Sequence, residues 1–120
     1  MNREIKFRAW DEVSEKMLNW NDFLDTNMKN TFIAPESTGL ILMQYTGFHD
    51  RFGNEIYESD IVYVRSEDEN ATIEWDEQRV RFIFHFDDWI ADFDNYYGKE
   101  LELMGDIYNN PELLGGEDEC

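Results

Sequence analysis

The sequence has few of the residues that build disulfides or metal centres. Among its 120 residues there are one cysteine and two histidines. A single cysteine, Cys120, cannot form an intramolecular disulfide or build a thiolate metal site. His49 and His85 are far apart in the chain, and no second pair of ligands stands at a recognisable spacing. We therefore expect no metal and no other cofactor.

Long apolar runs and clustered positive charge are also missing. No segment has the length of a signal peptide's apolar core or of a membrane-spanning helix, which predicts a cytoplasmic protein outside the membrane. The 28 acidic residues outnumber the 10 basic ones, for a net charge of −18. Neutralising phosphates requires clustered lysine and arginine, and here only Lys6 with Arg8 and Arg79 with Arg81 stand close together. We expect no direct binding of nucleic acid or of an anionic membrane.

Catalytic motifs are absent as well. No serine occupies a G-x-S-x-G turn, and no glycine-rich phosphate loop is present. A calcium loop beginning at Asp92 would need an oxygen ligand, a glycine and a glutamate where the chain has Tyr96, Tyr97 and Leu103. Neighbouring carboxylates are expected by chance in a chain this acidic. The sequence predicts a protein that is not an enzyme and has no catalytic residues.

Aromatic residues and alternating patterns are what the sequence does contain. Aromatics make up 16% of the chain, enough to build a core without disulfides. The pattern of apolar and polar residues predicts strands within 4–10, 17–20, 39–46, 56–65, 71–76, 79–86 and 101–108, with 56–65 either one strand or a pair of strands. In one of these strands, Val80, Phe82, Phe84 and Phe86 are expected to share a face. Short strands with frequent turns favour a mainly β fold, either a barrel or a sandwich.

Other segments are less regular and allow at most one or two short helices. Within residues 21–39, Phe23, Leu24 and Met28 fit one face of a short helix, and 31–34 fit a strand that ends at Pro35. Residues 86–98 place aromatics at helical spacing, which favours a short helix, although aromatic residues also suit strands. Residues 109–114 predict a turn followed by a short helical segment, because proline suits a first helical turn. We expect one domain over 1–114 and a flexible acidic tail over 115–120.

The stretch LMQYTGFHDRFGNEIYESDIV, which begins at Leu42, joins two strands through two bends. Gly53-Asn54 is a turn dipeptide, and Asp50 can accept a hydrogen bond from the N–H two residues further on. We interpret this stretch as a structural corner that sets strand register, with a presented binding loop as the alternative. Its signature residues are Gly47, Asp50, Gly53, Asn54, Tyr57 and Asp60.

Four segments together carry a family resemblance. EIKFRAWD (4–11), the stretch above, IEWD (73–76) and GDIYNNPELL (105–114) resemble, in the same order, the YopX family of bacteriophage and prophage proteins. The family pattern usually has glycine where this chain has Ser59. Serine there predicts either that the bend does not require glycine or that it is slightly strained. The resemblance implies a mainly β fold and the cytoplasm of a bacterial host, and it brings no catalytic or binding residue.

Three functions are compatible with these features. The first is a phage accessory protein without catalysis, which binds a host or phage protein and could also form a homo-oligomer. The second is an acidic DNA mimic that inhibits a host DNA-binding or defence protein; the alternative meaning of the charge is solubility. The third is a small metal-assisted enzyme that would use His49 and Asp50.

Overall fold

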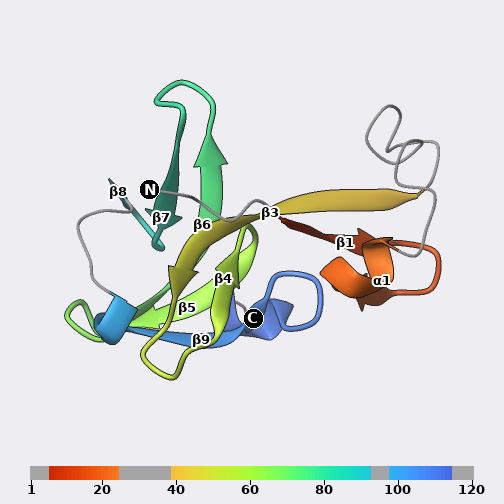
Figure 1. Cartoon of the computed structure of the whole chain (residues 1–120). Coiled ribbons are helices and arrows are strands. Elements are labelled where there is room, and N and C mark those ends of the chain that lie inside the picture. Colours follow the sequence, from red (N-terminus) through yellow and green to blue (C-terminus); the bar gives the residue numbers. More distant parts are fainter. Residues whose placement is uncertain (1–5, 25–38, 93–97, 115–120) are drawn as a thin grey trace. The chain divides into compact units, whose positions relative to one another are not determined.

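Residues 6–24, 39–92 and 98–114 are described by the computed structural model (Figure 1). The chain forms two compact units, Met1–Tyr45 and Thr46–Cys120, and passes from one to the other within strand β3 (Leu40–His49). Most described residues outside turns lie in antiparallel strands, which confirms the mainly β fold. That residues 1–114 behave as a single domain stays a prediction.

The first unit is built on a hairpin. Strand β1 (Phe7–Asp11) pairs with β2 (Lys16–Leu18) on one side and with the first half of β3 on the other. The side chain of Asp11 fixes the hairpin turn by accepting a hydrogen bond of 2.9 Å from the N–H of Val13. The predicted return strand ends earlier than expected, at Leu18.

A short helix, α1 (Trp20–Leu24), follows the hairpin. Asn19 accepts a hydrogen bond from the Asp22 N–H at 2.8 Å, and the Asp22 carboxylate accepts one from the Asn19 N–H at 3.4 Å. This reciprocal pair is a capping box, and it explains why Trp20 begins a helix instead of continuing the strand. The alternative strand at 31–34 lies outside the described residues.

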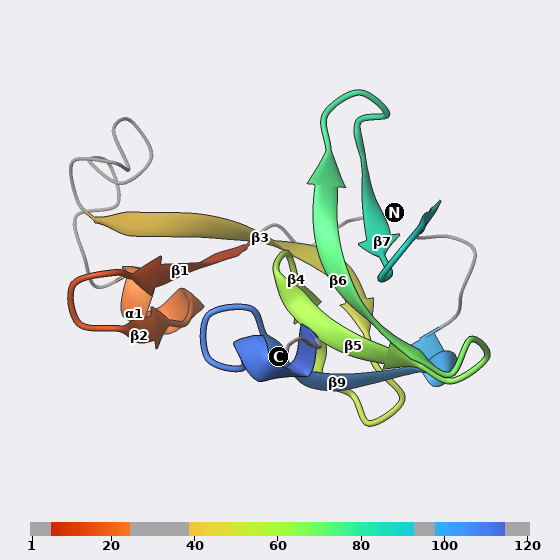
Figure 2. The ribbon, with the colours of Figure 1, turned by 180° about the vertical axis from the view of Figure 1, so that it is seen from behind.

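The second unit contains a five-stranded sheet in the order β8-β7-β6-β5-β9 (Figure 2). Its strands are β5 (Asp60–Val64), β6 (Glu69–Asp76), β7 (Arg81–His85), β8 (Ile90–Asp92) and β9 (Leu101–Asp106). Strand β4 (Glu55–Tyr57) pairs with β3, so of the two alternatives for 56–65, one strand or a pair, the pair is the one that forms. Short 3₁₀ helices η3 (Gly98–Glu100) and η4 (Pro111–Leu114) precede and follow β9, the second as predicted.

The core of this unit is apolar. It collects side chains that point to one face of the sheet together with one from β4: Ile56, Val62, Val64, Ala71, Ile73, Phe82, Phe84, Phe86, Ala91 and Leu101. The three phenylalanines at 82, 84 and 86 are buried as their spacing predicts.

Val80 does not join these phenylalanines, and the prediction for it is wrong. Its side chain is 70% exposed, and its φ is +55°. Val80 ends the turn after β6, where its N–H donates to the Asp76 carbonyl at 2.8 Å. Closing this turn requires a left-handed residue, and that local requirement overrides the strand pattern.

The helix favoured for 86–98 is also wrong where the structure describes it. Residues Ile90–Asp92 form β8, which pairs with β7, while 93–97 lie outside the described residues. The N–H of Phe86 donates to the carbonyl of Trp89 at 2.8 Å, so a two-residue turn reverses the chain. The rings of these two residues stack 4.1 Å apart. Backbone pairing with β7 therefore decides the structure of residues 90–92, and the helical spacing of the aromatic residues does not.

None of the described helices has the length and apolar character needed to cross a membrane.

We expect Val80→Asn to stabilise the second unit by about 1 kcal/mol, because asparagine tolerates positive φ and a β-branched residue does not. Urea unfolding monitored by tryptophan fluorescence measures the change. Val13→Asn is the control, because Val13 is also exposed in a turn but has no positive φ. Equal effects of the two substitutions would show that backbone strain at Val80 is not the cause.

Candidate functional site

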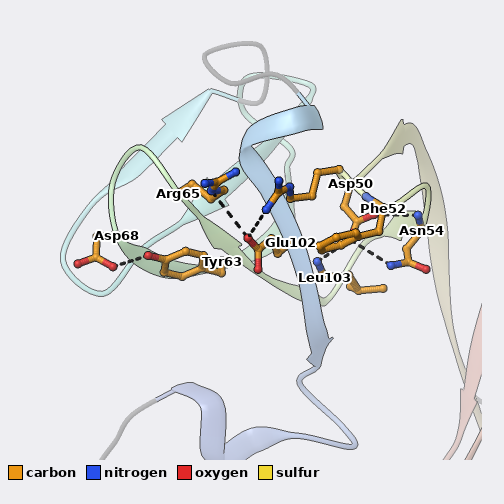
Figure 3. Close-up of polar contacts among 9 residues, drawn as sticks. Asp50, Phe52, Asn54, Tyr63, Arg65, Asp68, Glu102 and Leu103 are labelled. Carbon is orange, nitrogen blue, oxygen red and sulfur yellow. Dashed lines mark hydrogen bonds and ion pairs between the residues drawn. The ribbon is translucent and has the colours of Figure 1, made fainter.

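Asp50 is the centre of the most highly organised polar site among the described residues. We call residues 50–54, which join β3 to β4, the Asp50 corner (Figure 3). One carboxylate oxygen of Asp50 accepts hydrogen bonds from the N–H groups of Phe52 at 2.9 Å and Asn54 at 2.8 Å. The other oxygen accepts from the Asn54 side-chain amide at 3.1 Å and from the N–H of Leu103 at 2.8 Å. The predicted bond to the residue two positions on is present.

The backbone of the corner is closed by further bonds. The Asp50 N–H donates to the Asn54 carbonyl at 2.9 Å, and the Gly53 N–H donates to the Asp50 carbonyl at 3.1 Å. Gly53 has φ +87°, a conformation that glycine adopts without steric cost. Gly47, earlier in β3, also has positive φ. The loop is thus fixed from inside by one buried side chain and by its own backbone.

The bonds to β9 give the corner a role that local sequence does not reveal. Strand β9 is at one edge of its sheet, so alternate N–H and C=O groups point away from β5. The Leu101 carbonyl accepts from the Arg51 N–H at 3.0 Å, and the Leu103 N–H donates to Asp50. The Asp50 corner therefore covers this sheet edge, using a partner more than 50 positions away in the chain.

The environment of Asp50 shifts its ionisation. Burial is the largest single influence and opposes the charged form. The hydrogen bonds from Leu103, from both donors of Asn54 and from Phe52 outweigh it, and together they hold the pKa of Asp50 below the ordinary aspartate value. The carboxylate is therefore charged and structurally engaged at neutral pH.

Outside this buried carboxylate, the corner carries exposed charged and aromatic groups. The guanidinium of Arg51 lies 5.0 Å from the centroid of the Phe52 ring and pairs with Glu102 at 3.3 Å, and Arg65 approaches the same carboxylate at 3.8 Å (Figure 3). The Phe52 side chain is 68% exposed.

Beside Arg65, Tyr63 donates a hydrogen bond to Asp68 (Figure 3). This bond is the main cause that raises the pKa of the Tyr63 hydroxyl. Tyr63 lies in β5, and Asp68 lies in the turn that follows this strand.

In the described part of the second unit, two other aspartates are buried, and both accept hydrogen bonds from the backbone. Asp60 accepts a hydrogen bond from the N–H of Tyr57 at 2.7 Å, which closes the second bend of the signature stretch. Asp106 accepts from the N–H groups of Tyr108 at 3.0 Å and Asn109 at 2.8 Å. These two aspartates face each other in the β5–β9 register. Among the described residues of this unit, the three buried carboxylates thus all accept backbone N–H groups.

The bend between β4 and β5 is strained at Ser59. Its φ is +74°, in the region that favours glycine. Its N–H donates to the Ile73 carbonyl at 2.7 Å, and its carbonyl accepts from the Ile107 N–H at 3.1 Å. Backbone bonds on both sides hold the residue there, so of the two meanings given to this serine, strain is the one that the structure supports.

The residues considered as metal ligands do not form a group that could bind a metal ion together. His49 is exposed at the end of β3, and both oxygens of the neighbouring Asp50 already accept N–H groups. His85 lies within 2.8 Å of the Glu74 carboxylate. Over residues 6–24, 39–92 and 98–114, no three His, Cys, Asp or Glu side chains are grouped in a way that could hold a metal.

These features define a class: a small, mainly β protein whose best-ordered polar site is a structural corner. The family model described as YopX protein matches residues 6–115, and the chain therefore belongs to the YopX protein family. No curated protein sequence matches it. The chain is similar in fold to the crystal structure of protein EF1440 from Enterococcus faecalis. The TM-score is 0.67 at 24% identity, over 95% of this chain and 100% of that one.

We expect Asp50→Asn to lower the free energy of unfolding at pH 7 by about 2 kcal/mol, because an amide cannot accept all the bonds that the carboxylate accepts. The pKa of Asp50 is lowered in the folded state, so its stabilisation is complete above the ordinary aspartate pKa and is lost as pH falls through the folded value. The difference in the free energy of unfolding between the unmodified protein and Asp50→Asn should therefore become smaller below about pH 4.

Urea unfolding of both proteins from pH 7 to pH 2.5 measures this gap. Glu77→Gln, an exposed carboxylate in the turn after β6, is the control and should change stability little at any pH. A gap that stays constant down to pH 2.5 would contradict the ionised role of Asp50.

We expect Ser59→Gly to raise the free energy of unfolding by about 0.5–1 kcal/mol, since glycine relieves the positive φ and keeps both backbone bonds. Thermal unfolding tests this expectation. Glu58→Gly, at the neighbouring position without positive φ, should destabilise instead. Loss of folding in the Ser59 variant would overturn our interpretation of the bend.

Proposed function

We propose that this protein is a phage- or prophage-encoded accessory protein that acts without catalysis, by binding a protein partner through the outer side of the Asp50 corner. The observation that carries the proposal is the 68% exposure of Phe52 on a loop whose backbone is fixed by Asp50. The family resemblance supports the phage setting. The partner is a protein of the phage or of its bacterial host.

A fixed loop favours this use of Phe52. Binding orders the groups at an interface, and a loop that is already ordered loses less conformational entropy. The guanidinium of the adjacent Arg51 lies over the phenyl ring of Phe52. The same surface therefore presents a charged group beside an aromatic one. Arginine and aromatic residues, phenylalanine among them, are enriched in the cores of protein interfaces. The corner thus combines a structural inner side with a presented outer side.

The acidic DNA mimic is the second candidate, and fewer observations support it. It requires unpaired carboxylates that imitate a row of phosphates. In the second unit, Glu102 is shared by two arginines, and Asp92 and Asp76 are each paired with one. These pairs reduce the free negative charge that a mimic would need. Inhibition of a DNA-binding protein that disappears at high salt would favour this candidate over ours.

The test is capture of partners from a bacterial lysate by the immobilised full chain, with Phe52→Ser as the variant. We expect the variant to retain its fold, since Phe52 is exposed, and to lose captured proteins by about tenfold or more, as for an interface anchor. Val13→Ser is the matched control because Val13 is also an exposed apolar residue. Identical captured sets for all three proteins would contradict the proposal.

A further inference from the structure

Three hairpin turns of this chain close in the same way. They are the turns at 12–15, 65–68 and 77–80, which follow β1, β5 and β6. In each, the last residue of the turn has positive φ and donates its N–H to the carbonyl of the residue four positions earlier. The bonds run from Glu15 to Asp11 at 2.8 Å, from Asp68 to Val64 at 2.9 Å and from Val80 to Asp76 at 2.8 Å. The same backbone requirement is therefore met three times within one chain.

The type of residue that meets this requirement differs at one turn. Glu15 and Asp68 are polar and unbranched at Cβ, whereas Val80 is apolar and β-branched. A β-branched residue at φ +55° is a conformational outlier. The Val80 side chain is exposed, so burial in the free protein does not offset this strain. Strain of this kind is concentrated at binding and catalytic sites, where a residue serves a purpose other than folding.

The turn that carries Val80 is held by side-chain bonds. The Asp76 carboxylate accepts hydrogen bonds from the N–H groups of Gln78 at 3.0 Å and Arg79 at 3.4 Å. The Arg79 guanidinium approaches the same carboxylate at 3.7 Å. Val80 is thus presented on an ordered backbone, and a contact with it requires little further ordering of the turn.

Val80 lies at the end of a two-stranded arm (Figure 1). Strand β5 pairs with β6 only as far as Thr72, and β8 pairs with β7 only over residues 83–85. Residues 74–82 therefore form a hairpin end with no neighbouring strand among the described residues, and we call them the β6–β7 arm. A two-stranded ribbon alone is marginally stable in water and is stabilised by packing against another element.

The β6–β7 arm carries a second exposed apolar residue. Trp75 is 39% exposed, and its ring meets that of its cross-strand partner Phe82 edge-on, with the ring centroids 5.0 Å apart. Phe82 belongs to the core, so the contact holds the indole against the apolar face of the sheet. Trp75 and Val80 thus give the arm two exposed apolar side chains on an ordered backbone.

The charges on the arm indicate which kind of partner suits it. Arg79 is already paired with Asp76. Arg81 is paired with Asp92 at 3.1 Å. Glu77 in the turn is exposed, and the whole chain carries a charge of −18. A positively charged protein surface is attracted by this field, whereas an acidic protein or a second copy of this chain is repelled.

We propose that the β6–β7 arm docks onto a positively charged surface of another protein. Val80 and Trp75 contact apolar side chains of that surface, and Glu77 faces its lysine or arginine side chains. The occupant is a segment that combines an apolar stripe with basic residues, and an amphipathic basic helix has this pattern. The arm lies outside the Asp50 corner, so the two proposals fail independently.

The probe is a capped peptide of leucine and lysine, with its leucines at helical spacing, titrated into the ¹⁵N-labelled full chain. We expect saturable shifts of the Val80 amide signal and of the Trp75 indole N–H signal. A peptide with glutamate in place of every lysine should not bind, because the field of the protein repels it. A peptide with serine in place of every leucine should bind about tenfold more weakly.

Val80→Asn separates docking from folding. The substitution relieves the strain at positive φ and removes the apolar side chain, so it should raise the free energy of unfolding and weaken peptide binding about tenfold. A residue with a purely structural role would not change stability and binding in opposite directions. Val13→Asn is the matched control, because Val13 is also an exposed valine in a hairpin turn, and it should bind the peptide as the unmodified protein does.

Equal peptide affinity of Val80→Asn and the unmodified protein, equal binding of the glutamate and lysine peptides, or no saturable shift at millimolar peptide would overturn the proposal. So would shifts that leave Val80 and Trp75 unaffected. Binding to phosphatidylcholine vesicles that depends on Val80, without binding of the peptide, would identify a lipid surface as the occupant and would also overturn it.

Discussion

The carboxylate of Asp50 links parts of the second unit that are distant in sequence. It accepts two N–H groups from its own loop and one from Leu103 in β9. A charged acceptor of this kind is stronger than a neutral one, and it is costly to lose when buried. The turn after β3, the start of β4 and the edge of the sheet therefore depend on one side chain. This dependence also explains how a surface loop can present Phe52 while its backbone stays ordered.

The two edges of the sheet differ because only one of them is near such a loop. At β9, Arg51 and Asp50 bind the groups that would otherwise be available to another chain. At β8, the short hairpin leaves a three-residue strand with arginine and aromatic side chains beside it. Natural sheets shield edges with short strands and charge, and β8 has both features.

Local chemistry predicted much of the fold, and particular residues show where it failed. Asp50 and Gly53 were identified from turn chemistry because the bonds that define them span only a few residues. Val80 was misplaced because the strand pattern does not show that the turn needs positive φ there. The spacing of aromatic residues in 86–98 favours a helix. Residues 90–92 instead pair with β7 and form a strand. At the candidate site, the bond from Asp50 to the Phe52 N–H follows from the local turn, but the bond to Leu103 depends on where β9 lies.

The sequence by itself determined the mainly β class, the family, the positions of most strands and the internal bonds of the Asp50 turn. These follow from alternation and from interactions between residues close in the chain, which are the same in any context. Tertiary structure decided which carboxylates are buried, that Leu103 is the distant partner of Asp50, and which sheet edge the Asp50 corner covers. Those properties depend on pairing between segments far apart in the chain, and no local pattern records the register in which they meet.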